Sequence, residues 1–303
     1  MLQLPLDLTD VQLMSEGAEL ERAVASLDEH GWNQNSIVQH CTFSRLSATN
    51  AMIAEDILEI SMGKITSREE FISRAAEIER KAADIYSEFP KFLQVNHDEF
   101  PHPNRAPIEL LYLAYIRVDD LNHHFLLQRT LVKKIGADNS KLVDIAQKMF
   151  SFIVKIINHR DMFREFQIDM IQLLTMNGIP SAAVIAMELL HQEQNPASHS
   201  ALTNPLPRSG TIQDLSVFVA CLGTIKPTAN GFTSCNRGRQ FLKKILDTIL
   251  DLPPAGMSGD VLSGYNLGDY SLANPMFQTG NDGDFMRWLD TMEWESDTFI
   301  NFS

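Results

Sequence analysis

The sequence has 303 residues, of which 44% are hydrophobic and 21% charged, and these are the proportions of an ordinary globular protein. Its formal net charge is −14, which excludes the broad basic surface that phosphate backbones require, so direct DNA binding by this chain is not expected. The three cysteines, Cys41, Cys221 and Cys235, predict reduced thiols in a cytosolic or nuclear protein and are too few for a six-cysteine zinc cluster.

Neither a secretory leader nor a membrane span is expected. Residues 1–10 lack the basic start and the apolar run of a signal peptide. The charge-free run 170–187 contains Asn177, Gly178 and Pro180, which favour a turn between two helices over a span.

The N-terminal third is predicted to form three helices. Thr9 and Gln12 form a capping box for the first helix, which Gly31 ends. The second covers about 36–60, and the third starts at a capping box of Ser67 and Glu70 and stops before Pro90. The inward faces repeat every three or four residues: Leu13, Leu20, Val24 and Leu27; Leu46, Ile53, Ile57 and Ile60; Phe71, Ala75, Ile78, Ala82, Ile85 and Phe89.

The middle of the chain predicts a central buried helix and two longer neighbours. The fourth helix begins near Pro107, and its segment LLYLAYI is apolar on all sides. The fifth covers about 140–176, with a kink near His159, and Asn177-Gly178 closes it. Pro180 then starts a sixth helix. The inner face of the fifth is Leu142, Met149, Ile153, Ile156, Phe163, Met170 and Leu173.

A seventh helix at 211–225 and an eighth from about 234 to 252 complete an all-α fold, an antiparallel array or bundle of helices. No stretch alternates as a strand would. The composition predicts three parts: a helical regulatory domain at 1–252, a linker rich in glycine and proline at 253–281, and an acidic amphipathic segment with a short helix at 282–303.

The acidic end is the most unusual feature of the sequence. Residues 251–303 hold nine acidic residues and one basic residue, Arg287. Such a helix can place an apolar face in a groove of a partner protein while its carboxylates keep it solvated. The alternative is that it docks on this protein's own core. The predicted partner-binding residues, which begin at positions i, i+3, i+4 and i+7, are Phe285, Trp288, Leu289, Met292 and Trp294.

No catalytic constellation is found, and we predict no catalytic residue, metal or cofactor. Glu188 and His191 have the spacing of a helical di-metal site, and Asp120 with His123 gives a weaker pair. A surface or capping role is favoured for both pairs, because such spacings often arise by chance. Neighbouring His40 and Cys41 are not expected to cooperate, since adjacent helical residues point in different directions.

The order of segments resembles the regulatory region of fungal zinc-cluster transcription factors, the middle homology region with its C-terminal extension. The zinc cluster itself has no counterpart in this sequence. The matching stretches are LPLDLTD (4–10), AEDILEISMG (54–63), FPKFLQ (89–94), HHFLLQRTL (123–131), NGIPSAAVIAMELLHQ (177–192), RQFLKKILDTILD (239–251) and DFMRWLDTMEWESDTFINF (284–302).

The resemblance implies a nuclear protein that regulates transcription, often of nutrient-use or secondary-metabolism genes. It also implies a homodimer, and coactivator or Mediator-type proteins as partners of the acidic segment. Two alternatives remain at this stage: a helical receptor that senses a small molecule between the fourth and fifth helices, and an α-helical metalloenzyme.

Overall fold

The computed structural model describes residues 4–64, 67–95, 100–194 and 205–251. Within these ranges the regular elements are helices, and the one β-type pairing is an isolated bridge between Leu27 and Asn33. The predicted all-α class is therefore confirmed. The chain divides into two compact units, residues 1–167 and 168–303. The predicted linker and acidic segment lie outside the described residues.

The first unit begins with two short helices, α1 (Asp10–Leu13) and α2 (Ala18–Ala25). Thr9 caps α1 in a capping box with Gln12, as predicted. The prediction of one helix as far as Gly31 is wrong, because the chain breaks before α2 at Gly17, whose φ of +58° is incompatible with a continuous helix. Leu13 and Val24, expected to face inward, are 47% and 43% exposed.

Trp32 and Arg45 join this N-terminal segment to the next helix, α3 (His40–Met62). The Arg45 guanidinium lies 4.7 Å from the centre of the Trp32 ring, and it donates hydrogen bonds to the backbone oxygens of Pro5, at 2.6 Å, and His30. A planar cation suits this position because it can stack on a ring and donate in several directions at once.

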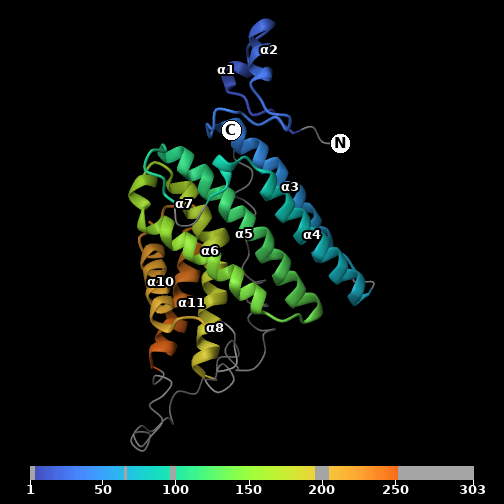
Figure 1. Cartoon of the computed structure of the whole chain (residues 1–303). Coiled ribbons are helices and arrows are strands. Elements are labelled where there is room, and N and C mark those ends of the chain that lie inside the picture. Colours follow the sequence, from blue (N-terminus) through green and yellow to red (C-terminus); the bar gives the residue numbers. More distant parts are fainter. Residues whose placement is uncertain (1–3, 65–66, 96–99, 195–204, 252–303) are drawn as a thin grey trace, which may run out of the picture. The chain divides into compact units, whose positions relative to one another are not determined.

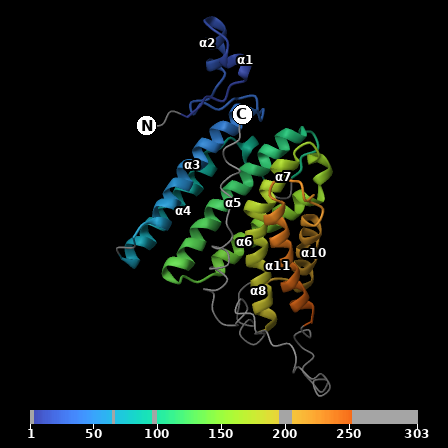
Figure 2. The ribbon, with the colours of Figure 1, turned by 180° about the vertical axis from the view of Figure 1, so that it is seen from behind.

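The helices α3, α4 (Arg68–Glu88) and α5 (Pro107–Ile135) pack against one another, and α6 (Ser140–Asn158) covers α5 (Figure 1). Figure 2 shows from behind that α3 and α4 run side by side. Ser67 caps α4 by accepting a hydrogen bond from the Glu70 amide, and the predicted inward faces of α3 and α4 are buried except for Ile85, which is partly buried. One cluster between these helices is Ile53, Ile57, Ile60, Phe71, Ala75, Ile78, Ala82 and Leu127.

The predicted central helix is confirmed in α5, where Leu110, Ala114 and Val118 are fully buried. Gly136 ends α5 in the left-handed conformation that glycine favours. The kink predicted near His159 is a complete break: α6 ends at Asn158, and the 3-10 helix η3 (Arg160–Phe163) follows.

The second unit contains a long helical stretch that the sequence predicted to be a corner. Helix α7 (Gln167–Leu173) continues through the π-helical turn η4 (Leu174–Gly178) into α8 (Ile179–Gln194). The predicted turn at Asn177 to Pro180 is therefore wrong. Proline removes an amide donor and crowds a preceding carbonyl, and the wider π turn accommodates both effects without ending the helix.

By length and composition, the stretch Gln167–Gln194 could cross a membrane, but 78% of its most apolar window is buried inside the protein. That is the pattern of a core helix. The unit is completed by α10 (Arg208–Leu222) and α11 (Phe232–Asp251), and α11 packs against both α8 and α10. The predicted inner face of α11 is buried: Leu242, Ile245, Leu246 and Ile249.

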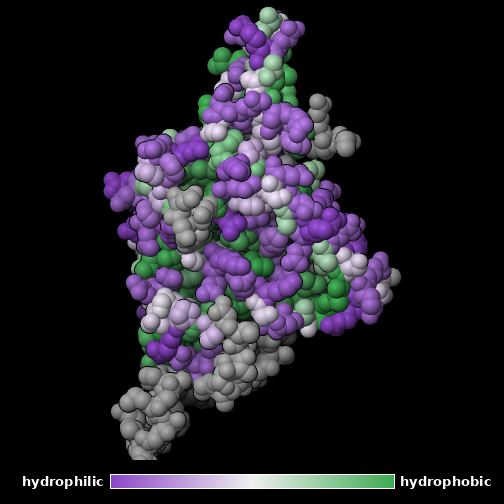
Figure 3. All heavy atoms as spheres, in the orientation of Figure 1, coloured by the Kyte–Doolittle hydropathy of each residue, from purple (hydrophilic) through white to green (hydrophobic). Residues whose placement is uncertain are grey.

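The surface of the first unit is mainly hydrophilic, with hydrophobic colour showing near the loop-linked ends of α3 and α4 (Figure 3). Three large apolar side chains on these two helices are exposed: Leu58 at 57%, Met62 at 80% and Ile72 at 45%. Isolated exposed apolar residues are normal on a protein surface and identify no partner by themselves.

Candidate functional site

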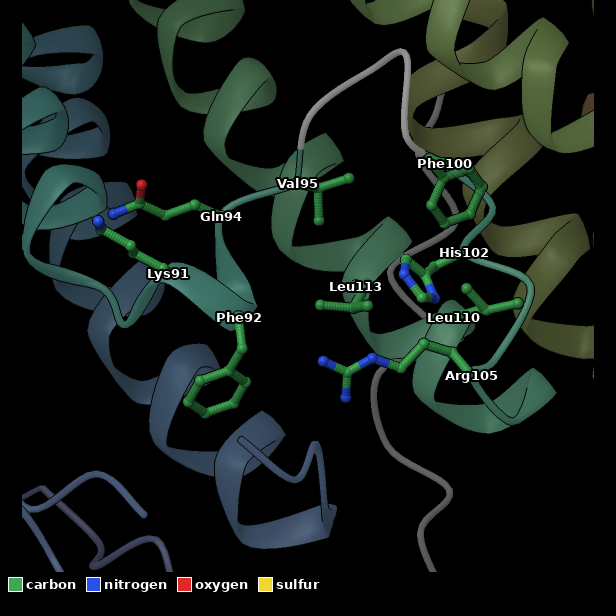
Figure 4. A pocket seen from close by; sticks show the side chains of 9 residues that line it. All are labelled: Lys91, Phe92, Gln94, Val95, Phe100, His102, Arg105, Leu110 and Leu113. Carbon is green, nitrogen blue, oxygen red and sulfur yellow. The ribbon is translucent and has the colours of Figure 1, made fainter. Parts of the chain in front are cut away.

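A cavity of about 210 Å³ lies beside the start of α5. The 3-10 helix η1 (Lys91–Leu93) forms one wall, residues 100–105 form another, and the first turns of α5 supply Leu110 and Leu113. Pro90 separates α4 from η1, because proline cannot continue a helix. Figure 4 shows the Arg105 guanidinium and the Phe92 ring on facing sides of the cavity.

The lining combines apolar and cationic side chains. Phe92, Phe100, Leu110 and Leu113 give apolar walls, whereas Lys91, His102 and Arg105 bring basic groups. Arg105 also donates to the Ser36 backbone oxygen at 3.1 Å and lies 3.5 Å from a carboxylate oxygen of Glu109. The cavity is therefore lined by apolar and basic side chains, of which Arg105 is already paired with Glu109.

This position differs from the pocket considered from the sequence, which placed the walls on the fourth and fifth helices. The fourth helix, α5, contributes only its first turns, and none of the lining comes from α6. Met149, Ile153 and Ile156 of α6 are completely buried in close-packed core. The two loops that form the other walls carry no periodic pattern, so periodicity could not predict them.

A second group of polar residues lies further along α5. Arg117 donates to Asp120 at 2.7 Å, and His124 lies 3.8 Å from the same carboxylate. Asn50 of α3 donates its amide to Asp119 at 3.2 Å. We call Asn50, Arg117, Asp119, Asp120, His123 and His124 the α5 polar cluster.

Burial shifts three pKa values in the α5 polar cluster: it raises that of Asp120, and it acts on Asp119 and His123 as follows. It raises the pKa of Asp119 to about 6, although the hydrogen bond from Asn50 acts in the opposite direction. It also lowers the pKa of His123 to about 4, with the neighbouring His124 adding to the effect. Both shifts favour the neutral form of the buried group. The cluster fits a structural polar network between α3 and α5.

The two metal-binding pairs considered from the sequence are not joined by a third ligand in the described part of the chain. Glu188 accepts a hydrogen bond from the Gln192 side chain at 3.0 Å, and His191 is exposed at the end of α8. Asp120 is engaged by Arg117 and His124 rather than grouped with His123.

Potential metal ligands from three side chains do meet elsewhere. Ligand atoms of Asp10, His40 and Cys41 lie within 4.8 Å of one another. His40 and Cys41 occupy the first two positions of α3 and border the loop before it, and that they do not act as a catalytic pair stays a prediction. Asp10 was missed altogether, since its closeness to residue 40 is a tertiary contact without a local sequence signal.

The predicted partner-binding residues lie outside the described residues: Phe285, Trp288, Leu289, Met292 and Trp294. Comparison of the chain with protein-family models, curated proteins and solved structures found no match.

Proposed function

We propose that this chain is the regulatory portion of a fungal zinc-cluster type transcription factor. In this proposal a helical region restrains the acidic aromatic end or responds to a signal, and the acidic aromatic end contacts coactivators. The observation that carries the proposal is the pattern at residues 284–302. Large apolar residues there recur at helical spacing within a strongly acidic stretch. That combination favours a protein groove with basic rims over a phosphate backbone.

The charge distribution supports this division of roles. Residues 251–303 carry a formal charge of −8, so −6 remains on the 250 residues before them. The helices of the described residues provide apolar cores and the α5 polar cluster, which are features of a scaffold. Their all-α class is also the class that the resemblance to the regulatory region implies. A nuclear location, dimerisation and control of metabolic genes belong to the same proposal.

The proposal is tested by tethering the whole chain to an unrelated DNA-binding domain and measuring reporter transcription. A matched chain that ends at residue 281 keeps every described helix and loses the acidic segment. We expect the full chain to activate and the shortened chain to be inactive at equal abundance. Equal activation by both would place the activity in the helical region and contradict the assignment to residues 282–303.

The cavity beside α5 favours a second candidate function, the sensing of a small anionic ligand. Its volume is below the range of sites for drug-sized molecules, so a compact aromatic or aliphatic carboxylate fits it best. Because a ligand that binds only the folded state raises the free energy of unfolding, binding would raise the melting temperature.

A thermal-shift screen of small carboxylates on the wild-type protein and on Arg105→Gln tests this second function. Stabilisation that depends on Arg105 would support sensing at the cavity. No stabilisation of the wild-type protein, or equal stabilisation of both proteins, would contradict it.

A further inference from the structure

We propose that Asp10, His40 and Cys41 form a zinc-binding site that joins α1 to the beginning of α3. The proposal concerns the helical region and is independent of what the acidic end does. It starts from the convergence of a carboxylate, an imidazole and a thiol within 4.8 Å of one another. These three donors are all common ligands of Zn²⁺.

The geometry matches what one ion requires. Tetrahedral zinc holds its ligands at about 2.0–2.3 Å, so its ligand atoms are about 3–4 Å apart. The three donor atoms lie within 4.8 Å of one another, so small side-chain movements would bring them to that separation. Asp10 and His40 are exposed, whereas Cys41 is buried. An ion can therefore enter from solvent, bind the thiolate at the protein surface and keep water as its fourth ligand.

A buried carboxylate beside the site holds its two backbone segments together. Asp7 is 1% exposed and accepts hydrogen bonds from the Asn33 backbone amide at 3.1 Å, the Gln39 side chain at 3.1 Å and the Thr42 hydroxyl at 2.5 Å. The Asn33 side chain also donates to it. Asp7 lies three residues before Asp10, and Thr42 follows Cys41, so these bonds fix the segments that carry the ligands. Fixed supporting contacts of this kind strengthen metal binding.

The local charge also suits a cation. The Asp10 carboxylate lies within 4.8 Å of the Cys41 sulfur, and the buried Asp7 carboxylate accepts a hydrogen bond from Thr42, the next residue along the chain. The amino end of α3 contributes a partial positive charge of about half a unit, and the two carboxylates outweigh it. When Zn²⁺ binds, the Cys41 S–H bond breaks, its proton passes to solvent and a zinc–sulfur bond forms.

The ion would stabilise α1, a helix that is not stable by itself. Helix α1 has four residues, which is far too short to be stable in isolation. A bond from Asp10 through zinc to His40 and Cys41 would hold α1 against α3. We therefore expect zinc to slow backbone hydrogen exchange in residues 7–14 and to leave the second unit unchanged.

The test uses the whole chain and cobalt, a spectroscopic substitute for zinc whose bond to a thiolate absorbs in the near ultraviolet. We expect a single equivalent of Co²⁺ to produce this absorption and Zn²⁺ to abolish it. The band should persist in a Cys221→Ser, Cys235→Ser double variant, because these two cysteines lie in the second unit. It should be absent in Cys41→Ser.

His40→Gln and Asp10→Asn change exposed side chains, so both variants should fold, and circular dichroism would confirm it. Each should weaken Zn²⁺ binding about tenfold or more in competition with a chromophoric chelator. Absence of the absorption band in the folded wild-type protein would overturn the proposal. So would a band that survives in Cys41→Ser, or zinc affinity unchanged in both His40→Gln and Asp10→Asn.

Discussion

Gly238 of α11 lies so close to Ile179 of α8 that a β-carbon at position 238 would stand 2.6 Å from Cδ1 of the isoleucine. It would also stand 2.9 Å from Cγ1 and 3.0 Å from Cγ2, so rotation of the isoleucine cannot relieve both branches. The absence of a side chain at 238 therefore permits the close approach of α8 and α11 in the second unit.

Gly238→Ala should lower the free energy of unfolding by about 1–3 kcal/mol, because overpacking outweighs the better helix propensity of alanine. Gly210→Ala is the matched control in α10, where an added β-carbon would meet nothing within 4 Å. That variant should be unchanged or up to about 1 kcal/mol more stable. Urea unfolding followed by circular dichroism measures both. Equal stability of the two variants would show that the helices can separate without cost.

Replacement of Asp7 should lower the stability of the first unit. Asp7→Asn keeps the size of the side chain but replaces one accepting oxygen with a donor that faces other donors. We expect the free energy of unfolding to fall by about 1–3 kcal/mol. Asp144→Asn removes a carboxylate from an exposed pair with Lys148 and should cost less than about 0.5 kcal/mol. Denaturant titration that finds equal costs would contradict the role of Asp7.

Asp119 should make the protein less stable as the pH rises. Its folded pKa of about 6 lies above the ordinary aspartate value of 3.8, so the folded state binds more protons between these values and loses this advantage above pH 6. At pH 7, Asp119→Asn should exceed the wild-type stability by roughly 1–3 kcal/mol. The excess should shrink as the pH falls towards 4. Denaturation of both proteins from pH 4 to 7 measures it, and a constant difference would refute the assigned shift.

His123, unlike Asp119, should make the protein less stable as the pH falls. Its folded pKa of about 4 lies below the ordinary histidine value of 6.5, so the unfolded state binds more protons between these values. Stability from this residue is present above pH 6.5 and is lost as the pH falls to about 4. His123→Gln should therefore reduce the acid sensitivity of unfolding in that range. An acid profile as steep as that of the wild-type protein would count against a buried neutral imidazole.

Local signals in the sequence predicted the fold well where helices begin and end by capping and periodicity. Ser67 and Pro90 bracket α4 within two residues of its observed bounds, and the apolar segment after Pro107 identified the central helix. In these cases local propensity and tertiary packing favour the same conformation.

The failures have tertiary causes. The periodic residues at 13–27 suggested one helix, but the chain breaks at Gly17, and the residues on either side of this segment are held by Asp7 and Arg45 through bonds to Thr42, Pro5 and His30. At Asn177 to Pro180, where a turn was predicted, a π-helical turn inside the core lets the helix continue. The cavity and the group of Asp10, His40 and Cys41 join residues from separate segments, and periodicity carries no information about such contacts.

The measurement closest to the proposed function is reporter transcription by the whole chain tethered to an unrelated DNA-binding domain, with Trp288→Ala and Trp294→Ala combined. Tyr270→Ala with Phe277→Ala is the matched control, because it removes two aromatic residues outside the predicted stripe. Loss of the two tryptophans proposed to contact the partner should reduce activation about tenfold or more, whereas the control should keep it. Activation by the tryptophan variant equal to that of the wild-type chain would contradict the proposed role of the acidic aromatic end.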